Sequence, residues 1–158
     1  MKDILVAIDP ASFESAAALF TLSGEFITTF QLSSNKKTWG ARFLDHHYQF
    51  NEMITPYKSR IATICYERNL KSSVSLLAQL GALIICLPEA ICSDITGVAP
   101  TSWKAWYRRT TNTKIKSPKG AESLRGLGGQ WAKFDGTDDM ADSCMIAMYY
   151  LDKLNNHE

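Results

Sequence analysis

Ile4-Leu5-Val6-Ala7-Ile8-Asp9-Pro10 is the stretch of sequence that decides the fold. Its five apolar residues, three of them β-branched, predict a fully buried strand inside a parallel sheet. Pro10 has no N–H to donate to a neighbouring strand, so pairing is expected to stop there. Asp9 then lies at the carboxyl end of the strand, where open α/β sheets bind their ligands, although Asp-Pro is also a common start of a turn.

The run Ile61-Ala62-Thr63-Ile64-Cys65-Tyr66-Glu67 has the same design, an apolar strand that ends on an acid. The elements expected between the two runs are a strand, a tight turn, a strand and a helix, at residues 16–22, 23–24, 25–32 and 36–57. A hairpin and a helix between two buried strands indicate a right-handed crossover, which makes the two strands parallel. We therefore expect Asp9 and Glu67 side by side at one edge of an α/β sheet.

The second half of the chain predicts three helices, one short strand and a long loop. They are expected at residues 72–86 (helix), 90–92 (strand), from Thr101 or Ser102 (helix), 110–129 (loop) and 137–154 (helix). Asp139 and Asp142 share a face at the start of the last helix, as do Asp138 and Asp142. Acids in a first turn also complement the helix dipole, which is the simpler interpretation of these residues taken alone.

Four carboxylates, those of Asp9, Glu67, Asp139 and Asp142, are the candidate site. Such acids cannot be buried together as bare charges, because repulsion and lost hydration would cost too much. Mg²⁺, or alternatively Mn²⁺, binds hard oxygen ligands and resolves this conflict. Two such ions in one site can activate a water and stabilise the leaving oxygen of a phosphodiester.

A basic segment supplies a candidate surface for a polyanion. Between Thr101 and Arg125 one acid, Glu122, stands among seven basic residues, while the whole chain has a net charge of only +1. This pattern favours binding of nucleic acid at a defined place over nonspecific coating. The candidate contacts are Lys104, Arg108, Arg109, Lys114, Lys116 and Lys119, some of which are expected to be solvated charges. Trp103, Trp106 and Tyr107, in the same segment, are expected in the core or a dimer contact rather than in base stacking.

Length and composition indicate one domain over residues 1–158 in a cytoplasmic protein. The chain has 46% hydrophobic and 21% charged residues, and no apolar run that reaches the roughly 18 residues of a membrane helix. Its four cysteines form no Cys-x-x-Cys pair and sit among apolar residues, which favours buried thiols over disulfides or a zinc site.

The order of these motifs resembles the RuvC family of Holliday-junction resolvases, which are RNase H-like nucleases. The resemblance rests on Ile-Asp-Pro at the first strand's end, Tyr-Glu at the fourth's, Val98-Ala99-Pro100 before Trp103-Lys104, and Asp-x-x-Asp opening the last helix. It implies an RNase H-like fold with a central mixed five-stranded sheet flanked by helices. The length and divergence resemble a bacteriophage member, which would act in the host cytoplasm.

The resemblance assigns the metal-binding acids to Asp9, Glu67, Asp139 and Asp142, with Asp139 preferred over Asp138 because the family's spacing is three. Lys104 matches a substrate-contacting lysine, and either Lys114 or Lys116 the second. Leu70 stands where the family can have an aromatic that wedges into the junction, and leucine cannot stack on bases as an aromatic does.

The function implied by the resemblance is paired nicking of four-way and other branched DNA by a homodimer with two Mg²⁺ or Mn²⁺ ions per site. The products would carry a 5′-phosphate and a 3′-hydroxyl. The alternatives are another RNase H-like nuclease, acting on RNA–DNA hybrids or as a transposase does, and a branched-DNA-binding protein without catalysis.

Overall fold

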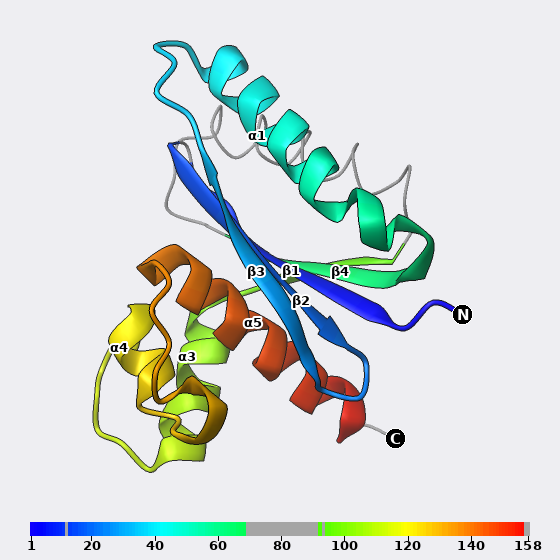
Figure 1. Ribbon diagram of the computed structural model, residues 1–158. Helices are drawn as coiled ribbons and strands as arrows, with labels where there is room; N and C mark the ends of the chain where they lie inside the picture. Colours follow the sequence, from blue (N-terminus) through cyan, green and yellow to red (C-terminus); the bar gives the residue numbers. More distant parts are fainter. Residues whose placement is uncertain (12, 69–91, 93, 157–158) are drawn as a thin grey trace.

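A computed structural model describes residues 1–11, 13–68, 92 and 94–156 of the chain, which contain a five-stranded sheet with helices on both faces (Figure 1). The strand order is β3-β2-β1-β4-β5. The pairs β1–β2 and β2–β3 are antiparallel, and the pairs β1–β4 and β4–β5 are parallel. The elements are β1 (Ile4–Asp9), β2 (Glu14–Thr21), β3 (Phe26–Ser33), α1 (Trp39–Ile54), the 3₁₀ helix η1 (Thr55–Arg60), β4 (Ile61–Glu67), β5 (Ile95–Val98), α3 (Pro100–Thr111), α4 (Gly120–Arg125), the 3₁₀ helix η2 (Gly129–Trp131) and α5 (Asp138–Asn155). The expected α/β fold with a central mixed sheet is confirmed.

Alternation along β1 divides the core into two layers. Ile4, Val6 and Ile8 pack into the cluster that includes residues of α1, whereas Leu5 and Ala7 pack into the cluster that includes α3, α4 and α5. Helix α1 covers one face of the sheet, and α3, α4 and α5 lie on the other (Figure 1). Because successive side chains of a strand point to opposite faces, Asp9 continues the series of Leu5 and Ala7 toward α5.

Strand β4 repeats this arrangement beside β1. Ile64 packs with the α1 layer and Cys65 with the α5 layer, so Glu67 continues the Cys65 series. The two strands are parallel with Ile8 opposite Tyr66, which brings their carboxyl ends to the same edge of the sheet. The carboxylates of Asp9 and Glu67 therefore both lie on the face of the sheet that α5 covers.

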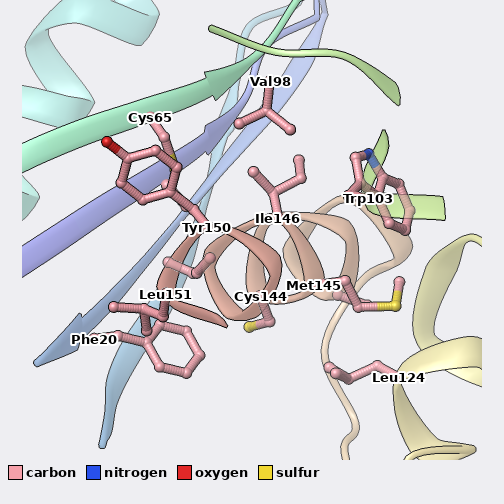
Figure 2. Close-up of a cluster of buried hydrophobic side chains, with 14 of the residues drawn as sticks. Phe20, Cys65, Val98, Trp103, Leu124, Cys144, Met145, Ile146, Tyr150 and Leu151 are labelled. Carbon is pink, nitrogen blue, oxygen red and sulfur yellow. The ribbon is translucent and has the colours of Figure 1, made fainter. Parts of the chain in front are cut away.

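Helix α5 is the centre of the larger core cluster. Cys144, Met145 and Ile146 are fully buried on it, and they lie beside Trp103 of α3 and Leu124 of α4 (Figure 2). The hydroxyl of Thr137 accepts a hydrogen bond from the N–H of Met140 and caps the helix start. The middle of α5 is buried between the sheet on one side and α3 and α4 on the other. This packing fixes the position of the first turn of α5.

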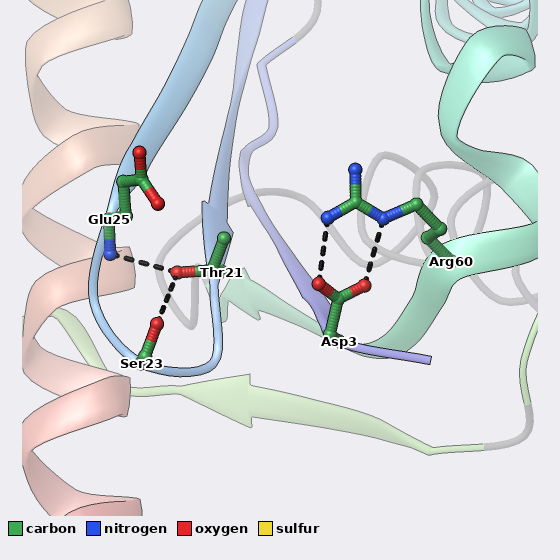
Figure 3. A network of polar contacts seen from close by, with 5 residues as sticks. All are labelled: Asp3, Thr21, Ser23, Glu25 and Arg60. Atoms are coloured by element: carbon green, nitrogen blue, oxygen red, sulfur yellow. Dashed lines mark hydrogen bonds and ion pairs between the residues drawn. The ribbon is translucent and has the colours of Figure 1, made fainter. Parts of the chain in front are cut away.

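Polar contacts at the opposite end of the sheet lie where β1 and β4 begin and in the turn between β2 and β3 (Figure 3). The Arg60 guanidinium makes two hydrogen bonds to the carboxylate of Asp3, at 2.9 and 2.7 Å. In the β2–β3 turn, the Thr21 hydroxyl accepts from the N–H of Glu25, and Gly24 has a φ of 99°. The turn that the sequence places at residues 23–24 is confirmed.

Two expected boundaries need correction. The helix expected at residues 36–57 is α1, which ends at Ile54, and a 3₁₀ helix with Pro56 in its first turn follows. The short strand expected at residues 90–92 falls mostly outside the described residues, whereas β5 at Ile95–Val98, which pairs with β4, was not predicted. The loop expected at residues 110–129 contains α4. The helix expected at residues 72–86, together with Leu70 and Cys86, lies outside the described residues.

Candidate active site at the carboxyl ends of β1 and β4

Asp9 is the centre of an acidic cluster that draws on three elements. The protein packed around its carboxyl removes hydration, and this is the largest of the effects that raise the pKa of Asp9 well above its ordinary value. Repulsion from Glu67, Asp142 and Asp139 raises this pKa further, and the ammonium of Lys104 opposes the rise. The four acids named from the sequence are thus close enough to repel one another, which makes this edge an electrostatically costly place in the metal-free protein.

Asp142 reaches the cluster from the second turn of α5. Burial, with the charges of Glu67 and Asp139, raises its pKa to about 6. Its Oδ1 accepts a 2.6 Å hydrogen bond from the N–H of Gly120, at the start of α4, and this bond favours the ionised form. Because the pKa of Asp142 rises overall, the loss of hydration outweighs the hydrogen bond at this carboxyl.

Glu67 is held by a tryptophan. The indole N–H of Trp103 donates a 2.7 Å hydrogen bond to Oε2 of Glu67, and the Trp103 side chain is completely buried in the α5 layer. The next residue of α3 is Lys104, whose Nζ lies 5.4 Å from the centre of the Trp103 ring. One helix therefore brings both a hydrogen-bond donor and a cation to the acidic cluster.

Asp138 and Asp139 have different surroundings in the first turn of α5. Gln31 of β3 donates from Nε2 to Oδ2 of Asp139 at 3.3 Å, and its Oε1 accepts from the hydroxyl of Thr137. Asp138 is exposed, and its Oδ1 accepts from the N–H of Ala121 at 2.8 Å. The charge of Asp139 acts on Asp9, whereas Asp138 serves to hold the start of α4.

The basic residues are distributed along α3 and the segment that joins it to α4, with Lys104 beside the cluster. Lys104 is the member whose charge acts on both Asp9 and Asp142. The others follow on α3 (Arg108, Arg109), on the connection to α4 (Lys114, Lys116) and directly before α4 (Lys119). The Arg108 guanidinium donates to the carbonyl oxygen of Lys116 at 2.6 Å, which ties this connection to α3. Trp103 and Tyr107 are buried, as expected for core residues.

The donor chemistry of the cluster fits a hard divalent cation. Carboxylates that raise one another's pKa in the metal-free state are the ligands that Mg²⁺ and Mn²⁺ take in proteins. Among the described residues, no group of three or more His, Cys, Asp or Glu side chains is arranged to hold a metal ion as these side chains stand. Metal binding would therefore require the carboxylates to turn toward one another.

Three of the four cysteines lie in the described part of the chain. Cys65, Cys92 and Cys144 are buried free thiols, as the sequence predicts. Burial raises the pKa of the Cys144 thiol to about 12, so it is inert at neutral pH. No helix in the described part of the chain is both long and apolar enough to cross a membrane.

Three contacts of the site were missed at the level of sequence. The sequence pattern predicted Trp103 as a core residue and Gly120 as part of a loop. It placed Gln31 within a strand without singling it out. The alternation of β3 is the one signal that could have found Gln31, since it shares a face with Thr29, which contacts Ser143 of α5. The bonds of Trp103 and Gly120 depend on how α3 and α4 dock, which no local pattern encodes.

Known structures share the fold of this chain, although sequence comparison finds no match. No protein-family model and no curated protein matches the sequence. Thermus thermophilus RuvC matches with a TM-score of 0.72 and 12% identity, and the T. thermophilus RuvC in complex with Holliday junction substrate with 0.70 and 14%, each over 98% of this chain and 96% of that one. The fowlpox virus Holliday junction resolvase matches with a TM-score of 0.54 and 14% identity, over 95% of this chain and 99% of that one. The chain thus has the RNase H-like fold of the RuvC resolvases.

Proposed function

We propose that this chain is a metal-dependent endonuclease of the RuvC type that nicks four-way and other branched DNA. The observation that carries the proposal is the position of Asp9, half-buried beside three further acids at the sheet edge of a RuvC-like fold. A cluster that raises the pKa of its own central carboxyl is unfavourable for a purely structural role. It is favourable for a site that binds cations.

Asp9, Glu67, Asp139 and Asp142 would hold two Mg²⁺ or Mn²⁺ ions. Bound there, such ions would supply a hydroxide nucleophile from water and stabilise the leaving oxygen of a phosphodiester. Among the chain's own residues, Trp103 and Gln31 each donate a hydrogen bond to one of the acids, and Lys104 supplies a positive charge beside them. Hydrolysis by this route leaves a 5′-phosphate and a 3′-hydroxyl, as the resemblance implies.

The basic residues between Lys104 and Lys119 would bind the DNA backbone next to the acids. Phosphate neutralisation by lysine and arginine gives most of the affinity of such interfaces and positions the strand. The T. thermophilus RuvC structure contains a Holliday junction substrate, which supports branched DNA as the partner. A four-way junction has two symmetric strands to cut, so we propose that two copies of the chain act as a homodimer with one site each.

The test is cleavage of one labelled four-way junction beside a matched duplex, a fork and an RNA–DNA hybrid, each with Mg²⁺ and with Mn²⁺. Asp9→Asn should abolish nicking and retain junction binding, because it removes a central ligand charge without changing the shape of the side chain. Asp3→Asn is the matched control, since Asp3 directly precedes β1 at its opposite end and binds Arg60.

Each outcome of this assay has a distinct meaning. Nicking of the junction by the wild type and by D3N, together with loss in D9N, supports the proposal. Wild-type cutting by D9N contradicts the assigned site. Preference for the hybrid favours another RNase H-like nuclease, and junction binding without nicking under either metal indicates a branched-DNA-binding protein.

A further inference from the structure

The hydrogen bond between Trp103 and Glu67 joins the hydrophobic core to the acidic cluster. Trp103 has no exposed surface and packs with Met145 and Ile146 of α5 (Figure 2). Its Nε1 lies 2.7 Å from Oε2 of Glu67. A ring fixed by packing on this scale has one orientation, so the N–H that it carries has one direction.

The chemistry of this pair suits the orientation of a metal ligand. An indole N–H donates but cannot accept, and it carries no charge that would compete with a cation for the carboxylate. At 2.7 Å the bond is at the short end of the range for N–H···O hydrogen bonds. It engages one of the two oxygens of Glu67 and leaves the other for a ligand.

The same helix provides a contrasting tryptophan. Trp106 is partly exposed, and its indole N–H donates at 3.1 Å to Asp152, near the far end of α5 from the acidic cluster. Both residues thus bond an aspartate or glutamate through the same indole atom. Only the bond of Trp103 reaches a carboxylate of the proposed site.

We propose that Trp103 is a positioning residue that holds Glu67 at the acidic cluster, as the fixed ligand toward which the other acids turn on metal binding, and that it couples α3 to this cluster. This inference rests on the proposed function. Since Lys104 follows Trp103 directly, the bond also ties the part of α3 that carries Lys104 to Glu67. Hydrogen-bond partners of metal ligands typically change metal affinity 10- to 100-fold when they are removed.

The first measurement tests the bond in the metal-free protein. A double-mutant cycle with Trp103→Phe and Glu67→Ala, followed by urea unfolding, separates the bond from the cavity that phenylalanine leaves. The unfolding equilibrium constant should show a coupling of about tenfold or more. The indole proton of Trp103 in the NMR spectrum gives the same information without a core substitution, because Glu67→Gln should shift it. If the two substitutions have additive effects on stability and the indole proton of Trp103 does not shift, the hydrogen bond is absent.

The second measurement tests the role. Trp103→Phe should weaken Mn²⁺ binding, followed through the EPR signal of free Mn²⁺, by about tenfold or more. It should also raise the Mn²⁺ concentration that half-saturates cleavage, with the KM for junction DNA unchanged. Trp106→Phe is the matched control and should bind Mn²⁺ as the wild type does.

The two proposals fail in different ways. If W103F and W106F bind Mn²⁺ equally well, Trp103 has no positioning role, even if the wild type is an active nuclease. If the wild type binds no Mn²⁺, the metal-dependent function and the positioning role both fail, while the double-mutant cycle still reports the bond. If W103F does not fold, the NMR shift and Mn²⁺ binding by E67Q replace it, and unchanged values of both contradict the inference.

Discussion

Asp142→Asn should make the metal-free protein more stable at neutral pH, although Asp142 belongs to the proposed site. The carboxyl of Asp142 loses hydration and faces the charges of Glu67 and Asp139. Asparagine removes the charge and keeps the Oδ1 that accepts from the N–H of Gly120. The substitution therefore removes a penalty and leaves the contact that holds α4.

The size of the penalty follows from the pKa. A carboxyl whose pKa rises from 3.8 in the unfolded chain to about 6 in the folded one disfavours folding by about 3 kcal/mol once it is ionised in both states. The folded protein holds this proton more tightly, so stability is highest below the unfolded pKa. It is lost as the pH rises from 3.8 to about 6, and it stays low above that. For a chain of this length, about 3 kcal/mol corresponds to roughly 6–12 °C in Tm.

The assay is thermal unfolding of the wild type and D142N in EDTA at pH 7.5 and at pH 4. D142N should unfold several degrees above the wild type at pH 7.5, and this difference should be mostly lost at pH 4. Asp138→Asn is the matched control, because Asp138 also accepts from the start of α4 but is exposed. A D142N protein that is less stable than the wild type at pH 7.5, or whose gain persists at pH 4, would refute the electrostatic reasoning. Millimolar Mg²⁺ should stabilise the wild type more than D142N, since the variant lacks one ligand charge.

Two further predictions concern DNA binding and α4. Replacing both Lys114 and Lys116 by alanine should weaken junction binding and reduce the slope of log affinity against log salt by about 2, and an unchanged slope in a fluorescence-anisotropy titration would contradict their contact with phosphate. Gly120→Ala should destabilise the protein by more than about 1 kcal/mol, because Gly120 has a φ of +77° and its added Cβ would lie 2.6 Å from Oδ1 of Asp138. Urea unfolding measures this loss, for which Gly40→Ala, with open space around its Cβ, is the control.

The sequence was most informative where a local pattern and burial agree. Continuous apolar runs predicted the two buried strands β1 and β4, and their last residues, Asp9 and Glu67, lie at the same sheet edge as expected. The start of the last helix was also predictable, because Thr137 caps it by the mechanism expected of a threonine at that position.

Short elements that are stabilised mainly by tertiary contacts could not be predicted from the sequence. β5 has four residues, one of them Gly97, and it exists because the neighbouring β4 provides a partner. α4 has six residues and no side-chain cap of its own, and the amides at its start donate to carboxylates of α5 instead. Short elements of this kind have little intrinsic stability, so propensity alone does not reveal them.

The acidic cluster is built from residues 133 positions apart, Asp9 in the first strand and Asp142 in the last helix. A fragment that lacks either end of the chain would therefore lose the proposed site, because the cluster exists only while α5 is docked on β1 and β2. A cation bound by this cluster would link the first strand to the last helix and so stabilise the whole fold. Resistance to proteolysis should accordingly increase throughout the molecule when the cation binds.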